Sequence, residues 1–220
     1  MSELRAVLFD MDGTLTDSEK LWTIALDRTA AELGGSLGEE ARHEMVGHDM
    51  WSSVDILQTD VGSSRPPQEV ARLLTDYTAE LFAEPLPWRP GAQQLLAAVK
   101  EAGLAMALVT ATHRSLVELA LDTLGHSTFG AIVCGDEVAH VKPHPEPYRR
   151  AMELLGVRPE QSLVIEDSPN GSASGLAAGL PVLVVPCDTD VPPRDGMTFR
   201  DSLEGLTAAD LRAIHAGSAG

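Results

Sequence analysis

Residues 4–19, LRAVLFDMDGTLTDSE, constrain this chain more than any other stretch. A short apolar run, residues 4–9, is followed at once by two carboxylates, Asp10 and Asp12, one residue apart. An apolar run bounded by turn residues predicts a buried strand, and open α/β sheets place their chemistry at the carboxyl ends of such strands. Two like charges about 4 Å apart repel by roughly 4 kcal/mol at an effective dielectric constant near 20. Because a metal cation or a shared proton would relieve that repulsion, the motif points to a metal-assisted reaction.

Size and charge narrow the class of protein. The chain has 220 residues, of which 44% are hydrophobic and 22% charged, and this argues against disorder. Its 33 acidic and 16 basic residues give a net charge of −17, which repels nucleic acid and anionic lipid, so we expect neither as a partner. Two cysteines, Cys134 and Cys187, make no disulfide framework. No recognisable signal peptide precedes Leu4, and no apolar run approaches the roughly 20 residues that span a bilayer, so we expect a cytoplasmic protein. We further expect a monomer or a weak homodimer.

Strand and helix patterns alternate through most of the chain. The strand candidates are residues 4–9, 104–110, 130–134, 162–166 and 181–185. The helix candidates between and after them are residues 91–102, 114–124, 145–155, 170–178 and 207–214. This alternation predicts an α/β fold with a parallel sheet and helices on both of its faces.

One segment breaks the alternation, because about 70 residues after the first strand contain no convincing strand. Apolar residues recur at helical spacing in three stretches, residues 18–33, 39–58 and 67–83. They predict a helical insert whose connections to the rest of the chain, residues 13–17 and 84–91, could form the hinge of a lid. The predicted domains are a core of residues 1–15 and 88–220 and a helical cap of residues 16–87.

Polar groups that suit phosphoryl transfer follow four separate apolar runs. They are Asp10 with Asp12, then Thr110, then Lys142, and finally Glu166 with Asp167. In a parallel sheet all of them can meet at the carboxyl edge. A carboxylate there can act as a nucleophile, and hard oxygen ligands can hold Mg²⁺. The ammonium and the hydroxyl can bind the phosphate oxygens, and such reactions depend mainly on positioning and charge stabilisation.

The segments FDMDGTLTDSE, LVTAT, VKPHPEPY and VIEDSPNG, in this order, resemble the four motifs of the haloacid dehalogenase superfamily. The resemblance covers essentially the whole chain. It implies a Rossmann-like core with an inserted all-helical cap and a Mg²⁺-dependent phosphatase activity. Within the superfamily the chain is similar to the β-phosphoglucomutase-like and sugar-phosphate phosphatase branch, which implies a small phosphorylated substrate such as a sugar or polyol phosphate.

The same resemblance implies roles for the acidic residues. Asp10 would attack phosphorus to form an aspartyl-phosphate, while Asp12 would protonate the leaving oxygen and then activate water. Asp10, the backbone carbonyl of Asp12 and Asp167 would bind Mg²⁺. Glu166 would be a further ligand or the close support of one.

The remaining motif residues would contact the phosphate. Thr110 and the N–H of Ala111 would hold the phosphoryl group, and Lys142 would neutralise charge between the nucleophile and the phosphate. Substrate contacts from the cap are expected from Glu19, Trp22, His48 and Trp51.

Two departures from the motifs favour hydrolysis over mutase chemistry. Mutase relatives carry a histidine where this chain has Trp22, and a basic residue normally follows the cap glycine that Gly47 matches. Here His48, Asp49 and Trp51 follow it, without Arg or Lys. A phosphosugar mutase remains the alternative, and a non-catalytic scaffold that binds a metabolite or partner is the third hypothesis.

The histidines suggest no metal site of their own. His43, His113, His126, His140 and His144 are scattered and do not share a helix at ligand spacing. We therefore expect no structural zinc site.

Overall fold

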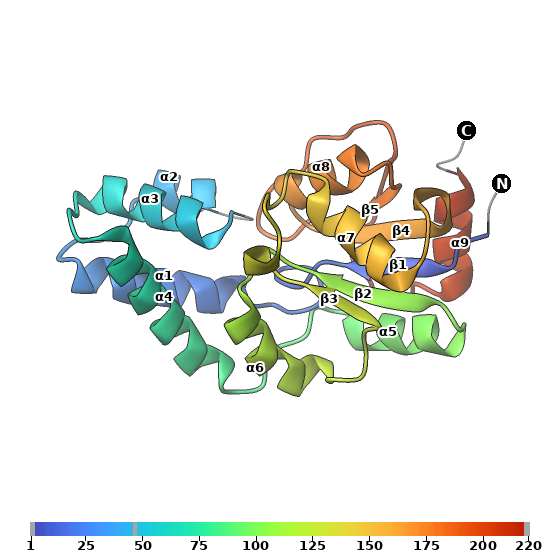
Figure 1. Ribbon diagram of the computed structural model, residues 1–220, viewed down its shortest axis with the longest axis horizontal. Helices are drawn as coiled ribbons and strands as arrows, with labels where there is room; N and C mark the ends of the chain where they lie inside the picture. The colour runs from blue at the N-terminus through green and yellow to red at the C-terminus, as the bar shows by residue number, and fades with distance from the viewer. Residues whose placement is uncertain (1–2, 46–47, 218–220) are drawn as a thin grey trace.

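The computed structural model describes residues 3–45 and 48–217 and has a six-stranded sheet at its centre (Figure 1). The strands are β1 (Ala6–Phe9), β2 (Ala105–Val109), β3 (Ala131–Val133), β4 (Ser162–Glu166), β5 (Val182–Val184) and β6 (Met197–Phe199). They are all parallel, in the order β3-β2-β1-β4-β5-β6. The predicted α/β class and parallel sheet are confirmed. The edge strand β6 was missed because three half-buried residues make no apolar run.

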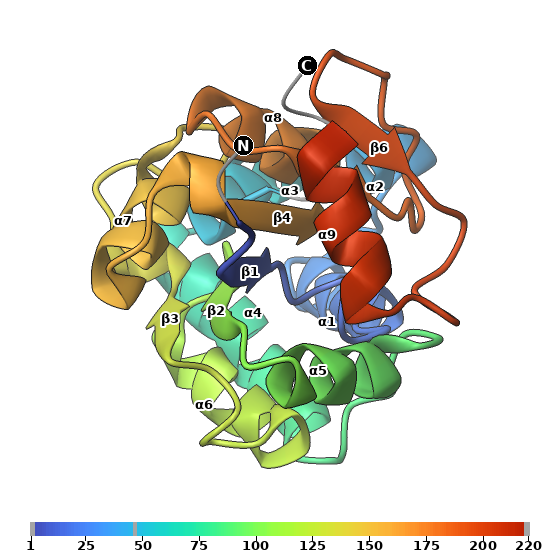
Figure 2. The ribbon, with the colours of Figure 1, turned by 90° about the vertical axis from the view of Figure 1, so that its right-hand side faces the viewer.

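Helices cover both faces of the sheet (Figure 2). One face packs on α5 (Ala92–Glu101), α6 (Arg114–Leu124) and α9 (Ala208–Gly217), and the other on α7 (Glu146–Leu155) and α8 (Pro169–Ala177). Two short 3₁₀ turns, Gly135–Glu137 and Pro159–Gln161, complete this part. Successive strand residues point to opposite faces, so Val7 and Phe9 join one apolar cluster while Ala6 and Leu8 join the other. None of the helices in the described ranges is long and apolar enough to cross a bilayer.

Four further helices form a group at the carboxyl ends of the strands (Figure 1). They are α1 (Glu19–Glu32), α2 (Glu39–Met45), α3 (Met50–Val61) and α4 (Pro67–Phe82). This helical group has an apolar core of its own, to which Leu57 and Leu74 contribute. The helix expected around residues 39–58 is two helices, since the Asp49 carboxylate caps α3 by accepting hydrogen bonds from the N–H groups of Trp51 and Ser52.

The two connections between the helical group and the sheet run side by side. Asp17 N donates to Pro87 O at 2.8 Å, and Arg89 N donates to Leu15 O at 2.9 Å. Chain segments about 70 residues apart are therefore joined by backbone hydrogen bonds. The boundaries of a core and a cap, and a hinge motion between them, stay predictions.

Gly91 ends the second of these connections, residues 84–91, and packs closely against the backbone at Glu204. Its φ is +83°, and a Cβ there would lie 2.3 Å from Glu204 N, whereas a Cβ on Gly62, at φ +68°, would meet nothing within 4 Å. Both Gly→Ala changes carry a backbone cost of about 1–2 kcal/mol, and Gly91→Ala adds overpacking that typically costs about 1–3 kcal/mol. We expect Gly91→Ala to lower the free energy of unfolding clearly more than Gly62→Ala in urea denaturation. Equal losses of unfolding free energy in the two variants would contradict the close packing of Gly91 against Glu204.

Candidate active site

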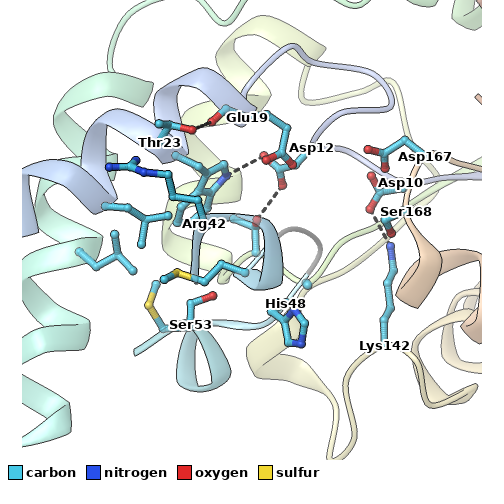
Figure 3. Close-up of a pocket in the computed structure, with 17 residues that line it drawn as sticks. Asp10, Asp12, Glu19, Thr23, Arg42, His48, Ser53, Lys142, Asp167 and Ser168 are labelled. Atoms are coloured by element: carbon cyan, nitrogen blue, oxygen red, sulfur yellow. Dashed lines mark hydrogen bonds and ion pairs between the residues drawn. The ribbon is translucent and has the colours of Figure 1, made fainter. Parts of the chain in front are cut away.

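The chemistry-bearing residues from separate strands meet at one edge of the sheet. Asp10 follows β1, Thr110 follows β2, and Glu166 ends β4, directly before Asp167. Because β2, β1 and β4 are neighbours, their carboxyl ends bring these groups together. Lys142 reaches them from the loop before α7 (Figure 3).

The Lys142 ammonium lies buried between two carboxylates. Its Nζ is 2.6 Å from Asp10 Oδ1 and 2.6 Å from Glu166 Oε1, and it also donates to Val109 O at 2.9 Å. Burial alone would lower the pKa of Lys142, but the two carboxylates outweigh it and raise that pKa above its ordinary value. The lysine is therefore a fixed positive charge in the site.

Glu166 is fully buried, and both of its oxygens are occupied by donors. Oε1 accepts hydrogen bonds from Lys142 and from the hydroxyl of Tyr148 at 2.9 Å. Oε2 accepts from the N–H of Asp167 at 3.1 Å and from the N–H and hydroxyl of Ser168 at 3.2 and 3.0 Å. Gly171 makes room for this carboxylate, since a Cβ there would lie 1.6 Å from Oε1. These contacts favour a supporting role for Glu166.

Three buried carboxylates could hold a metal ion. Asp10, Glu166 and Asp167 each offer an oxygen, and these atoms lie within 4.8 Å of one another. Burial raises the pKa of Asp10 to about 7, with Glu166 and Asp12 adding to the rise and Lys142 opposing it. Burial and the charge of Asp10 also raise the pKa of Asp167 well above its ordinary value. A hard divalent cation matches an all-oxygen donor set of this kind and would offset the repulsion.

Asp12 is held by four donors from two parts of the chain. Its Oδ1 accepts hydrogen bonds from Ser18 Oγ at 2.6 Å and Trp22 Nε1 at 3.1 Å. Its Oδ2 accepts from Thr112 Oγ1 at 2.7 Å and Thr110 Oγ1 at 3.3 Å. Thr110, predicted to hold phosphate, thus points its hydroxyl at Asp12 in this structure.

A cavity lies between the sheet edge and the helical group (Figure 3). The predicted site residues that line it are Asp10, Asp12, Glu19, Trp22, His48, Ala111, Lys142 and Asp167. Thr110 and Glu166 are buried and do not line it. Trp51 is 51% exposed and lines a second groove outside this cavity, while Gly47 falls outside the described residues.

Sequence reasoning gave no role to several polar residues of the site, among them Ser18, Thr112 and Arg42. Ser18 and Thr112 bind Asp12, and Arg42 of α2 lines the cavity. The Arg42 guanidinium forms an ion pair with Asp27 and donates to Leu37 O at 3.4 Å. Arg42 precedes Gly47, the position after which a basic cap residue was expected, and Thr112 belongs to the motif LVTAT, in which only Thr110 and Ala111 were given roles.

Glu19 is the acidic group of the cavity on the helical side. Burial raises its pKa to about 8, and repulsion from Asp12 and Asp188 adds to the rise. The side chain of Asp188 comes from the loop after β5, so both parts of the molecule contribute negative charge here. A hydroxyl group of a ligand could form a hydrogen bond with Glu19, whereas a second anionic group would be repelled by Asp12 and Asp188.

The chain resembles known proteins over nearly all of its length. A family model described as haloacid dehalogenase-like hydrolase matches residues 7–185. Hexitol phosphatase B of Escherichia coli K12 is 31% identical over 220 residues, covering 95% of this chain and 97% of that protein. A phosphoglycolate phosphatase of Rhodospirillum rubrum is 33% identical over 191 residues, covering 82% and 79%. A mutant CbbY from Rhodobacter sphaeroides, solved in complex with xylulose-1,5-bisphosphate, has a TM-score of 0.84 at 31% identity, with 94% and 99% coverage.

The raised pKa of Glu19 predicts a pH-dependent loss of stability without metal. In the unfolded chain its ordinary pKa is 4.5, so between about pH 4.5 and 8 the folded protein must retain a proton that the unfolded chain has lost. Its destabilising effect is therefore absent below that range and grows as pH rises through it. We expect Glu19→Gln to gain on the order of 1 kcal/mol at pH 8, about 2–4 °C in Tm, and little at pH 4.5.

The matched control is Glu44→Gln, which changes an exposed glutamate of α2. Thermal melts of both variants in a chelating buffer at several pH values check the prediction. A Glu19→Gln gain that does not increase with pH would contradict it.

Proposed function

The chain belongs to the haloacid dehalogenase-like hydrolases, and we propose that it uses Asp10 to remove phosphate from a sugar or polyol phosphate. It is a phosphoric monoester hydrolase that acts on small phosphorylated metabolites. The observation that carries the assignment of Asp10 is its carboxylate in the cavity, held at 2.6 Å by a buried ammonium within a cluster of further acids.

In the proposed reaction Asp10 forms a bond to phosphorus while the bond between phosphorus and the leaving oxygen breaks. Asp12, once protonated, gives its proton to that oxygen and releases the alcohol. Asp12 then takes a proton from water, and the water oxygen attacks phosphorus to free Asp10 and inorganic phosphate. Lys142 offsets the negative charge of the free Asp10 carboxylate, which limits repulsion between this carboxylate and the approaching phosphate.

The buried acids fit Mg²⁺ as the cofactor. We propose Asp10, the backbone carbonyl of Asp12 and Asp167 as its protein ligands, with Glu166 holding Lys142 and the start of α8 in place. When bound, Mg²⁺ supplies positive charge to the phosphate oxygens. Thr112, Ala111 and Ser168 line the same side of the cavity and offer hydroxyl or N–H groups to a phosphoryl group.

Trp22 is proposed as a positioning residue for Asp12. Its indole N–H donates to Asp12 Oδ1 at 3.1 Å, and its ring packs edge-on against Phe82 at a centroid distance of 6.0 Å. An indole can donate one hydrogen bond but cannot accept or carry a proton. It can therefore orient Asp12 without sharing its proton, unlike the histidine of mutase relatives.

The charges around the leaving group support hydrolysis of a monophosphate over a mutase reaction. Among the residues that the structure describes, the cations lining the cavity are Lys142 and Arg42, and Arg42 is paired with Asp27. Glu19 lines the same cavity and offers a second phosphate no positive charge, and the nearby carboxylates of Asp12 and Asp188 would repel it. Formation of an isomeric sugar phosphate without free phosphate would favour the mutase, and binding without turnover would favour the scaffold.

Replacement of the proposed nucleophile tests the mechanism. Asp10→Asn should keep the fold and lower kcat by at least about 10⁴-fold, because the amide cannot form the acyl phosphate. Phosphate release would be measured over a panel of sugar, polyol and nucleotide phosphates and phosphoglycolate, with Mg²⁺ and with a chelator. We expect turnover to require Mg²⁺.

The control is Asp122→Asn, an exposed residue of α6, which should retain wild-type turnover. Thermal melts establish that both variants fold. Substantial activity in Asp10→Asn would show that the assigned nucleophile is wrong.

Substitution of Trp22 tests the positioning role. Trp22→Phe keeps an aromatic ring and removes the N–H, and the loss of a hydrogen bond to a charged group, about 1.5–3 kcal/mol, should lower kcat roughly 10- to 100-fold. KM should change less than kcat, because the bond is made to Asp12 and not to the substrate. A fall in Tm that accounts for the lost activity, or an unchanged kcat, would refute the role.

A further inference from the structure

Two histidines and a glutamate meet outside the cavity, in the loop that leads into α7. His140, His144 and Glu146 each offer a ligand atom, and these atoms lie within 4.8 Å of one another. The two imidazole rings have centroids 4.5 Å apart. The spacing His140-x-x-x-His144 gave no signal in the sequence because it falls in a loop and not on a helix.

Backbone hydrogen bonds hold the Glu146 carboxylate in a fixed orientation. Its Oε1 accepts from Ala139 N at 2.8 Å, and its Oε2 accepts from His140 N at 3.1 Å. The bond from Ala139, together with the His140 side chain, lowers the pKa of Glu146, so the group is ionised at neutral pH. This is a negative ligand atom that is already oriented.

The imidazoles lie at distances from this carboxylate that suit a shared ion. Nδ1 of His140 is 2.8 Å and Nδ1 of His144 is 3.8 Å from Glu146 Oε2. Tetrahedral zinc with bonds near 2.1 Å separates two of its ligand atoms by about 3.4 Å, which lies between these values. Nδ1 of His144 accepts a hydrogen bond from Glu146 N at 3.2 Å, and an ion bound at this nitrogen would replace that bond.

The surroundings leave access for a cation from solvent. The side chains of His140 and His144 are 66% and 48% exposed, and the groove beside them is also lined by His48, His113 and Asp136. The net charge of −17 raises the local concentration of cations. Imidazole nitrogen favours zinc, nickel or copper over Mg²⁺, which prefers oxygen ligands, so the cavity acids and this cluster select different ions.

Lys142 lies in sequence between the two histidines, so the cluster is part of the segment that positions the buried ammonium. Its Nζ contacts Asp10 and Glu166 at 2.6 Å each, so a small shift of the loop would disturb both contacts. Bringing the 2.8 and 3.8 Å separations to about 3.4 Å requires shifts of roughly half an ångström. Such shifts would be transmitted to Lys142 through the loop.

We propose that His140, His144 and Glu146 bind one zinc-class transition-metal ion, and that this ion slows turnover by displacing Lys142. The second part rests on the proposed function. The binding part does not.

Binding is tested by isothermal titration of the protein with Zn²⁺ in excess Mg²⁺, using His140→Gln, His144→Gln and the double variant. The control is His126→Gln, which removes another exposed histidine paired with a single acid, Asp122, at 3.0 Å. Wild type and His126→Gln should bind one more Zn²⁺ than the double variant, and each single variant should bind on the order of 10- to 100-fold more weakly. Visible spectra with Co²⁺ should show a tetrahedral ion that the double variant lacks. Equal stoichiometry in the double variant and His126→Gln would overturn the site, provided melts show that both are folded.

Turnover is tested by phosphate release at saturating Mg²⁺ with increasing Zn²⁺. Wild type and His126→Gln should lose activity at the Zn²⁺ concentration that fills the site, and the double variant should need at least about tenfold more. Equal inhibition of the double variant would place the inhibitory ion elsewhere and overturn the second part. If wild type releases no phosphate from any substrate, the proposed function fails, and the binding titration still decides the site.

Discussion

A single buried ammonium makes the acidic sheet edge possible. Three carboxylates, Asp10, Glu166 and Asp167, offer oxygens within 4.8 Å of one another, an arrangement that burial and mutual repulsion both oppose. Lys142 contacts two of them at 2.6 Å, so the ends of β1 and β4 can stay paired although each delivers an acid. A buried charge is tolerated when it is paired and hydrogen-bonded. Lys142 meets this condition through Asp10 and Glu166, and each of these carboxylates meets it through Lys142. The loop that carries Lys142 therefore supplies the positive charge that offsets Asp10 and Glu166.

The sequence predicted the features that depend on local pattern and on the motifs. The runs around Ala6–Phe9 and Ala105–Val109 are buried strands because apolar continuity is a local property, and parallel pairing then placed Asp10 beside the end of β2. Contacts between residues far apart in the sequence could not be predicted from local pattern. Thr112 lies 100 positions from its partner Asp12, and only the docking of β2 on β1 brings them to 2.7 Å. Arg42 was passed over for a similar reason, since nothing in the spacing of α2 shows that it faces a cavity.

Asp12 links the helical group to the sheet. Ser18 and Trp22, which hold Oδ1, belong to the connection and first helix of the helical group, whereas Thr110 and Thr112, which hold Oδ2, follow strand β2. A displacement of the helical group would move the partners of one oxygen and leave those of the other in place. The carboxylate would then lose up to two of its four hydrogen-bond donors and would be oriented by the remaining two alone. The orientation of the Asp12 carboxylate is thus coupled to the position of the helices by its hydrogen bonds.

The charges at the far end of the cavity restrict what can be bound there. Glu19 lines the cavity together with apolar side chains of the helical group such as Leu26, Met50 and Leu74. An anionic group in that place would have to be compensated by Arg42, and Arg42 would first have to leave Asp27. The guanidinium would then satisfy the ligand while leaving Asp27 without its partner, so little net stabilisation would result. A neutral group with hydroxyls makes no such demand, because it can donate to Glu19 and lay its carbon chain against the apolar wall. The distribution of charge in the cavity therefore favours a ligand that is anionic at one end only.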